Sequence, residues 1–262
     1  GNKGKQILFC GPSNKSVDQV AYWMITKLGK NCPNIVRMYG RSIEAVEFPI
    51  PGKTFLSKRS MRECRAAENI ADISLHHLIR EKRKPYAEEI NAYDRKFKQQ
   101  GYIPNYKEVQ TYIHLLKLAT VEQLKMHDVI LCTTAVASNA KLLEGTDIYQ
   151  IIIDEAAMCP EPQCLVPIIA TKAEQVVLIG DHKQLQPIIM CKEAAELGLE
   201  KSMFERHVLS KSRDRNNVQY TLLEIQYRMH PQLCDFPSKE FYENKLKTGF
   251  TRHWQEGQRL EG

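Results

Sequence analysis

The fold of this chain is decided by two stretches, Gln150-Ile-Ile-Ile-Asp-Glu-Ala-Ala157 and Gln175-Val-Val-Leu-Ile-Gly-Asp-His-Lys-Gln-Leu-Gln-Pro187. Each begins with a short, continuously apolar run, which is typical of a strand buried on both faces of a parallel sheet. Each run then ends in acidic residues. In open parallel sheets, ligands bind beyond the carboxyl ends of the strands. We therefore expect these acidic residues to lie at one ligand-binding edge.

Similar apolar runs recur on both sides of these stretches. Further strands are predicted at 6–10, 35–38, 128–133 and 218–225, and helices at 15–28 and 193–208. The helix at 15–28 follows from apolar residues that recur every three or four positions. Strands that alternate with helices predict an α/β fold built on a doubly wound parallel sheet.

A helical insertion is predicted at about residues 58–127. This region is rich in Lys, Arg and Glu, and apolar residues form helical stripes at 70–79 and 112–118. Its densest basic cluster, Lys82-Arg-Lys84, is either a solvated helix face or a contact to nucleic acid.

Composition restricts the classes of protein to which the chain can belong. Its 262 residues are 43% hydrophobic and 26% charged, which is typical of a soluble globular protein. No apolar run is long enough to span a membrane, and the basic N-terminus does not resemble a signal peptide. The eight cysteines form no C-x-x-C pair, which favours reduced thiols in the cytoplasm or nucleus. The net charge of +6 favours polyanionic partners.

The polar residues that follow the two deciding strands suit a nucleotide site. Asp154 could hold Mg²⁺, and Glu155 could polarise the water that attacks a γ-phosphate. Gly180 and Asp181 end the next strand at the same edge. The neutral amide of Gln184 could then bond a terminal phosphate without adding repulsive charge. Taken alone, Asp154 and Glu155 could equally be surface acids at the end of a strand.

Ordered motifs resemble those of superfamily 1 nucleic-acid helicases. DEAA at 154–157, GDHKQLQP at 180–187 and QYRMHP at 226–231 resemble motifs II, III and IV. GPSN at 11–14 and CTT at 132–134 resemble motifs Ia and Ic of the branch that includes the RNA helicase of nonsense-mediated decay.

The resemblance implies a RecA-like P-loop NTPase fold. The first RecA-like domain would span residues 1–210 and carry the insertion, and a second would begin at 218–262. ATP and Mg²⁺ would be the cofactors, with Asp154 as the metal ligand and Glu155 and Gln184 as catalytic residues. Tyr227 would lie near the adenine and Arg228 would act as an arginine finger. An ordinary packing pair is the alternative for these last two residues.

The same resemblance implies contacts to single-stranded RNA or DNA. Residues where a helix begins favour phosphate, although simple N-capping is the alternative. Hydroxyl contacts to a nucleic-acid backbone carry no base code, so binding is expected to be independent of sequence. The predicted contact residues are Pro12, Ser13, Asn14, Thr133, Thr134 and Ser138.

No G-x-x-x-x-G-K-[ST] phosphate loop occurs in the sequence, and PGKT at 51–54 lacks its first glycine and its preceding strand. We expect that loop upstream of Gly1 and the last helicase motifs beyond Gly262. The predicted function is therefore a fragment of an ATP-dependent helicase, with the fragment itself inactive. The resemblance implies movement 5′ to 3′. The alternative is a non-catalytic scaffold that binds nucleic acid or protein; another P-loop NTPase, such as a kinase, is disfavoured by the segments around Gln184 and Arg228.

Overall fold

The computed structural model describes residues 5–53, 65–210 and 220–249. The chain divides into two compact units, Gly1–Arg206 and His207–Gly262. The first unit contains a five-stranded sheet and the second contains a two-stranded sheet. No helix in the described part of the chain is long and apolar enough to cross a membrane.

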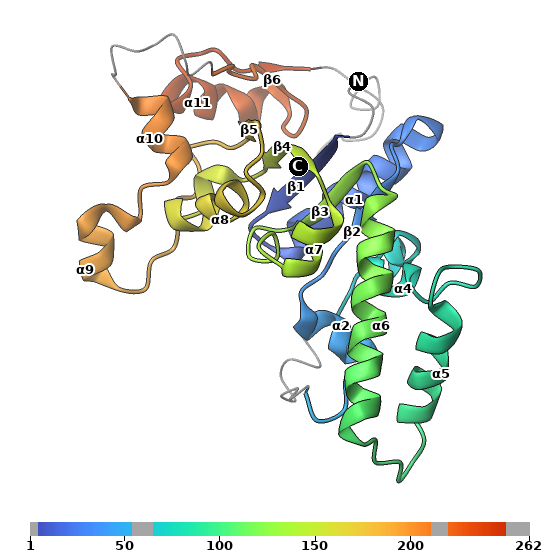
Figure 1. The fold of residues 1–262 in the computed structure, drawn as a ribbon. Coiled ribbons are helices and arrows are strands. Elements are labelled where there is room, and N and C mark those ends of the chain that lie inside the picture. The colour runs from blue at the N-terminus through green and yellow to red at the C-terminus, as the bar shows by residue number, and fades with distance from the viewer. Residues whose placement is uncertain (1–4, 54–64, 211–219, 250–262) are drawn as a thin grey trace. The chain divides into compact units, whose positions relative to one another are not determined.

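The five-stranded sheet is parallel throughout, with strand order β2-β3-β1-β4-β5 (Figure 1). This order confirms the predicted α/β fold with a parallel sheet. The five strands predicted for this sheet correspond to the observed ones to within two residues at each end. The strands are β1 Gln6–Gly11, β2 Ile35–Arg37, β3 Val129–Thr133, β4 Ile148–Ile153 and β5 Gln175–Leu178.

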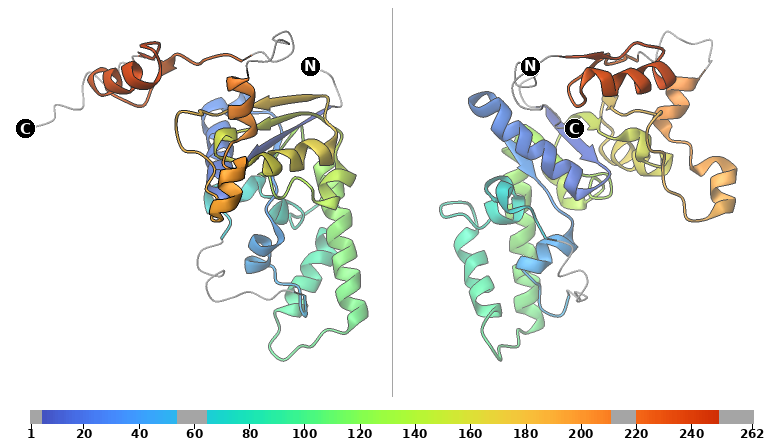
Figure 2. Two further views of the ribbon diagram at one scale, coloured as in Figure 1. Left: turned by 90° about the vertical axis from the view of Figure 1, so that its left-hand side faces the viewer. Right: turned by 180° about the vertical axis from the view of Figure 1, so that it is seen from behind.

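Helices cover both faces of this sheet, as a doubly wound fold requires. Phe9 and Leu131 pack with Val17 and Ala21 of α1 (Asn14–Leu28) in one core cluster. The alternate residues of the same strands, such as Leu8, pack in a second cluster on the other face. That cluster includes residues of α6 (Tyr106–Lys125), α7 (Ala140–Gly145) and α8 (Glu161–Thr171). The views in Figure 2 show α1 on the opposite side of the sheet from α7 and α8.

Strand β5 departs from the prediction of a buried strand. Val176 is 40% exposed and Val177 is 38% exposed, whereas β1 and β3 are almost wholly buried. The physical reason is position, because β5 is an edge strand that pairs only with β4 within the described residues. An apolar run predicts a strand but does not predict where in the sheet that strand lies.

The predicted helical insertion consists of η2 (Glu68–Ile73), α4 (Leu75–Leu78), α5 (Ala87–Phe97) and α6. Its first predicted residues, 58–64, lie outside the described residues. Helices α5 and α6 run side by side (Figure 1). Asn105 and Glu108 form a capping box at the start of α6, which explains why this helix begins at Tyr106. The sequence prediction did not include η1 (Gly29–Asn31) and α2 (Arg41–Glu47), which precede the insertion.

Two predicted elements were wrong in extent. The helix expected at 193–208 is broken into α9 (Lys192–Ala194), η4 (Ala195–Leu199) and α10 (Met203–Leu209). Gly198 causes the break, because its φ of 97° is not helical.

The strand expected at 218–225 is reduced to β6 (Ile225–Gln226) in the described residues. Its only partner there is the two-residue β7 (Lys247–Thr248), so the ladder cannot extend further. Helix α11 (Pro231–Phe241) lies between these two strands in the sequence.

Candidate functional site

The strand register brings the predicted site residues of the first unit to one sheet edge. Cys10 of β1 lies level with Cys132 of β3 and with Ile153 of β4, and Ile153 lies level with Leu178 of β5. The chain therefore leaves four strands at the same edge. The segments that begin there contain GPSN, TT, DE and GD, as the sequence predicted.

Asp154 and Glu155 form a sharp turn directly after β4. The backbone N–H of Glu155 donates to Oδ1 of Asp154 at 3.0 Å, and Glu155 has left-handed backbone angles (φ 51°, ψ 37°). The turn leaves Asp154 half-buried and Glu155 exposed, just before η3 (Ala156–Met158). Burial raises the pKa of Asp154, because desolvation disfavours its charged form. A bound cation would offset that desolvation.

Gly180 allows the loop after β5 to pass close to this turn. Ala156 N–H donates to the carbonyl of Ile179 at 2.8 Å. A Cβ on Gly180 would lie 2.9 Å from the backbone nitrogen of Ala157, which is too close for a side chain. Only glycine therefore fits between the two loops without a shift.

Asp181 organises the loop that carries Gln184. Its Oδ1 accepts from the backbone N–H of Lys183 at 2.9 Å, and its Oδ2 accepts from Nε2 of Gln184 at 2.8 Å. The structure thus places the amide of Gln184 on Asp181, beside the loop that bears Asp154. Mg²⁺ prefers oxygen ligands and is commonly held by one or two carboxylates together with phosphate oxygens. A half-desolvated Asp154 with Asp181 at the same edge fits that preference.

Helix α1 begins at this edge with a capping box. Ser13 Oγ accepts from the backbone N–H of Ser16 at 3.2 Å, and Ser16 Oγ accepts from the backbone N–H of Ser13 at 3.4 Å. Ser13 therefore caps α1, and this cap is compatible with a contact to phosphate. Ser13 is exposed, and Pro12 and Asn14 are half-buried. The side-chain oxygen of Asn14 accepts from Nη2 of Arg37 at 2.8 Å, so this atom points toward β2.

Arg37 is the centre of a buried network that the sequence analysis missed. Its side chain is fully buried, and its Nε donates to Oδ1 of Asp18 at 2.7 Å. Tyr39 donates its hydroxyl to the same Asp18 oxygen at 2.9 Å, and burial raises the pKa of Tyr39 to about 12. The available signal was an arginine within an apolar strand, because a buried charge requires a partner.

A pocket of about 340 Å³ opens beside this network, on the surface of α1. Its polar walls include the basic side chains of Lys15 and Arg65, which favour an anionic ligand. The lining residues are Asn14, Lys15, Asp18, Gln19, Tyr22, Ile43, Arg65, Ala67 and Asn69.

The hydroxyl groups predicted to contact nucleic acid differ in exposure. Thr134 is fully buried, and its hydroxyl accepts from Nε2 of Gln163 at 2.7 Å. Thr133 is also buried, whereas Ser138 is exposed. In the described conformation, the side chain of Thr134 holds its loop against α8. Sequence reasoning did not find Gln163, whose role depends on a contact across 29 positions.

In the second unit, Tyr227 and Arg228 lie on the loop between β6 and α11 and are both exposed. Gln226 shapes this loop, because its Oε1 accepts from the backbone N–H groups of Arg228 at 2.8 Å and Met229 at 2.7 Å. Its Nε2 donates to the carbonyl of Met229 at 2.7 Å. Gln226 is thus a positioning residue for the two residues that follow it.

Comparison with known proteins identifies relatives over nearly the whole chain. Two family models, each described as an AAA domain, match residues 1–192 and 199–260. The chain is 39% identical to the 3'-5' exoribonuclease HELZ2 of Mus musculus over 98% of its residues. It is 35% identical to a regulator of nonsense transcripts 1 homolog of Arabidopsis thaliana over 94% of its residues. It is 32% identical to the ATP-dependent helicase NAM7 of Saccharomyces cerevisiae, also over 94%.

The chain spans only a small part of these relatives. It covers 8% of the mouse protein, 17% of the Arabidopsis protein and 22% of the yeast protein. Within the helicase branch, GPSNKSVD at 11–18 and IGDHKQL at 179–185 resemble helicase with zinc finger domain 2, which agrees with the mouse relative.

Proposed function

The chain belongs to the AAA-domain family of superfamily 1 helicases, and from this premise we propose that it forms part of an ATP-driven motor on single-stranded nucleic acid. The observation that carries the proposal is the gathering of Asp154, Glu155, Asp181 and Gln184 at one sheet edge. Carboxylates and a neutral amide at that edge are the groups that nucleotide hydrolysis requires.

Each of these side chains has a proposed role in ATP hydrolysis. Asp154, with Asp181 beside it, would hold Mg²⁺, which when bound neutralises charge on the phosphate oxygens. Glu155, exposed at its turn, would orient the attacking water and accept its proton. Gln184 would donate its amide N–H to a terminal phosphate oxygen, and Asp181 would keep that amide in place.

The second unit would supply the groups that complete the site. Tyr227 would lie near the adenine, and Arg228 would stabilise charge on the transferred phosphoryl group. Gln226 would hold both residues in position through its bonds to the loop backbone. Closure of the two units around ATP and their reopening after hydrolysis would drive movement, which we propose to be 5′ to 3′.

Single-stranded RNA or DNA is the proposed track, and the cytoplasm or nucleus the proposed location. The names of two relatives refer to RNA, namely an exoribonuclease and a regulator of transcripts. Exposed Ser13 and Ser138 are the best-placed side chains for phosphate, whereas Thr133 and Thr134 would need to act through their backbone. Contacts to phosphate predict that binding weakens as the salt concentration rises.

ATP turnover by a longer polypeptide that contains this chain tests the proposal. We expect turnover that single-stranded RNA or DNA stimulates, with the stronger of the two identifying the track. Stimulation by neither, with nucleic acid still bound, would favour the non-catalytic scaffold. We expect little turnover from these 262 residues alone, because their sequence holds no G-x-x-x-x-G-K-[ST] loop. Turnover by them that Glu155→Gln abolishes would contradict that expectation.

A further inference from the structure

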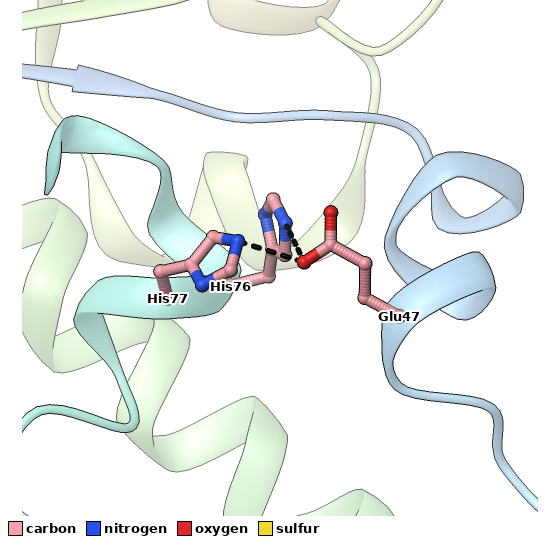
Figure 3. Close-up of side chains that lie close together, drawn as sticks. All are labelled: Glu47, His76 and His77. Carbon is pink, nitrogen blue, oxygen red and sulfur yellow. Dashed lines mark ion pairs between the residues drawn. The ribbon is translucent and has the colours of Figure 1, made fainter. Parts of the chain in front are cut away.

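Three potential metal ligands, Glu47, His76 and His77, meet where α2 ends near α4. Figure 3 shows the rings of His76 and His77 converging on one carboxylate oxygen of Glu47. Oε2 of Glu47 lies 2.8 Å from Nε2 of His77 and 3.7 Å from Nε2 of His76. One ligand atom from each residue lies within 4.8 Å of the other two. Two successive histidines on one short helix thus share a single acidic partner.

The buried ring of His76 lacks a hydrogen-bond partner among the described residues. Its side chain is only 2% exposed, and neither of its ring nitrogens makes a hydrogen bond to the described residues. A buried polar group without a partner is rare in native proteins and costs free energy. Tyr39 and Phe48 enclose the ring edge-on, at centroid distances of 5.6 and 6.1 Å.

The three donor atoms indicate which class of metal ion the cluster would bind. Two imidazole nitrogens and one carboxylate oxygen suit Zn²⁺ and similar transition metals, whereas Mg²⁺ and Ca²⁺ prefer oxygen ligands alone. Bond lengths of about 2.0–2.1 Å to a tetrahedral zinc ion place two ligand atoms roughly 3.3 Å apart. The observed separations of 2.8 and 3.7 Å lie on either side of that value.

We propose that Glu47, His76 and His77 bind a divalent transition-metal ion, with Zn²⁺ as the representative of its class. Three protein ligands would leave one coordination position open, as in zinc sites that also bind water or a small ligand.

The surroundings hold these ligands in place. Arg80 donates through Nη1 to the backbone carbonyl of His76. Its guanidinium lies 3.6 Å from the centre of the Phe48 ring, and its charge is paired with Asp94 at 2.7 Å. Fixed neighbours reduce the reorganisation that binding requires. A metal ion here would join α2, which follows strand β2, to the helical insertion, and would stabilise the folded chain by binding it selectively.

Competition between the metal-free 262-residue chain and a chromophoric chelator tests the proposal, with Zn²⁺ as the probe. We expect one Zn²⁺ site whose affinity falls at least about tenfold in Glu47→Gln and in His77→Gln. Both residues are partly exposed, with side-chain exposures of 32% and 35%, so these variants should fold. The matched control is His114→Gln, because His114 is an exposed histidine of α6. Zn²⁺ should also raise the melting temperature of the wild type and of the control more than that of either variant.

Free cysteines are the competing explanation for any zinc that binds, and Cys191 is exposed. Co²⁺ in place of Zn²⁺ distinguishes the two, since thiolate ligands add a strong charge-transfer band in the near ultraviolet. The proposal predicts a Co²⁺ spectrum without that band. Circular dichroism would establish that each variant is folded. No zinc binding by the wild type, unchanged affinity in both folded variants, or a thiolate band would each overturn the proposal.

Discussion

The α1–β2 crossover and the helical insertion are each stabilised by one buried arginine that pairs with an aspartate and lies on an aromatic ring. In the crossover, Arg37 donates to Asp18, which also accepts from the hydroxyl of Tyr39. The Arg37 guanidinium lies 3.9 Å from the centre of the Tyr39 ring. The side chains of this network lie between Asn14 and Tyr39 in the sequence, and Asn14 joins them through Arg37. The backbone N–H of Ala67 also donates to the Tyr39 hydroxyl, at 3.1 Å.

In the helical insertion, Arg80 has the role that Arg37 has in the crossover. It pairs with Asp94, which also accepts from the hydroxyl of Tyr112, and it lies over the ring of Phe48. Arg80 follows α4, Asp94 lies in α5, Tyr112 lies in α6 and Phe48 follows α2, so the network joins elements that are distant in sequence. The same chemistry therefore supports the site edge in one region and positions the His76–His77 cluster in the other.

The largest expected effect comes from removing either arginine. Arg37→Met and Arg80→Met should each lower the free energy of unfolding by about 3–5 kcal/mol, because each leaves a mostly buried aspartate without its cation. Hydrogen exchange should then show lost protection in α1 and β2 for the first variant, and in α4, α5 and α6 for the second.

Arg206→Met is the control for both, because its pair with Glu161 is exposed and should contribute less than about 1 kcal/mol. If Arg37→Met and Arg80→Met lost protection in the same elements, the two networks would not be separate supports.

Adding a methyl group to Gly180, at the sheet edge, should have the next largest effect on the free energy of unfolding. Gly180→Ala should lower the free energy of unfolding by about 1–3 kcal/mol, because its Cβ would lie 2.9 Å from the backbone nitrogen of Ala157. Gly40→Ala is the matched control, since its Cβ would meet Val136 at an ordinary 3.5 Å. Urea unfolding of both variants measures the difference. Equal losses would mean that the loops at the edge are not in close contact.

Alkaline pH should weaken the crossover network through Tyr39. Its folded pKa of about 12 lies above the ordinary value of 10.0, so the folded state holds the proton more tightly. The stabilisation is complete below pH 10 and is lost as the pH rises toward 12, at about 1 kcal/mol per pH unit. Tyr39→Phe should reduce the slope of unfolding free energy against pH over this window. An unchanged slope would show that this hydroxyl does not titrate as the network requires.

The smallest effect concerns the start of α1. Ser13→Ala should cost about 1 kcal/mol, because it removes the N-cap. If Ser13 also contacts phosphate, nucleic-acid binding by the longer protein should weaken in this variant as it does in Ser138→Ala, whose residue is exposed at the same edge. If nucleic-acid binding is unchanged in Ser13→Ala, the Ser13 side chain caps the helix and does not contact phosphate.

The sheet and its edge could be predicted from sequence because their signals are local. Apolar runs mark β1, β3 and β4, and polar residues follow directly where these strands end. Parallel pairing then brings those ends together without any further information. The exposure of β5 could not be predicted, since it depends on which strands lie beside it.

The buried networks and the cluster of Glu47, His76 and His77 could not be predicted for a different reason. Arg80 meets Tyr112 across 32 positions, and Glu47 meets His77 across 30, so no spacing along the chain reveals either pair. The prediction of one helix at 193–208 was wrong because of a single residue, Gly198, whose positive φ interrupts the helix. The strand predicted at 218–225 is not formed over 220–224, because β7 offers too short a ladder within the described residues.

The most direct test of the nucleotide site is ATP turnover by Glu155→Gln in the longer protein, in the presence of single-stranded RNA. We expect a loss of at least about 100-fold in turnover, with RNA binding retained, because Glu155 would act on the attacking water alone. Glu161→Gln, in the neighbouring helix α8, should keep nearly full turnover. Undiminished turnover by Glu155→Gln would show that the sheet edge does not hydrolyse ATP through Glu155.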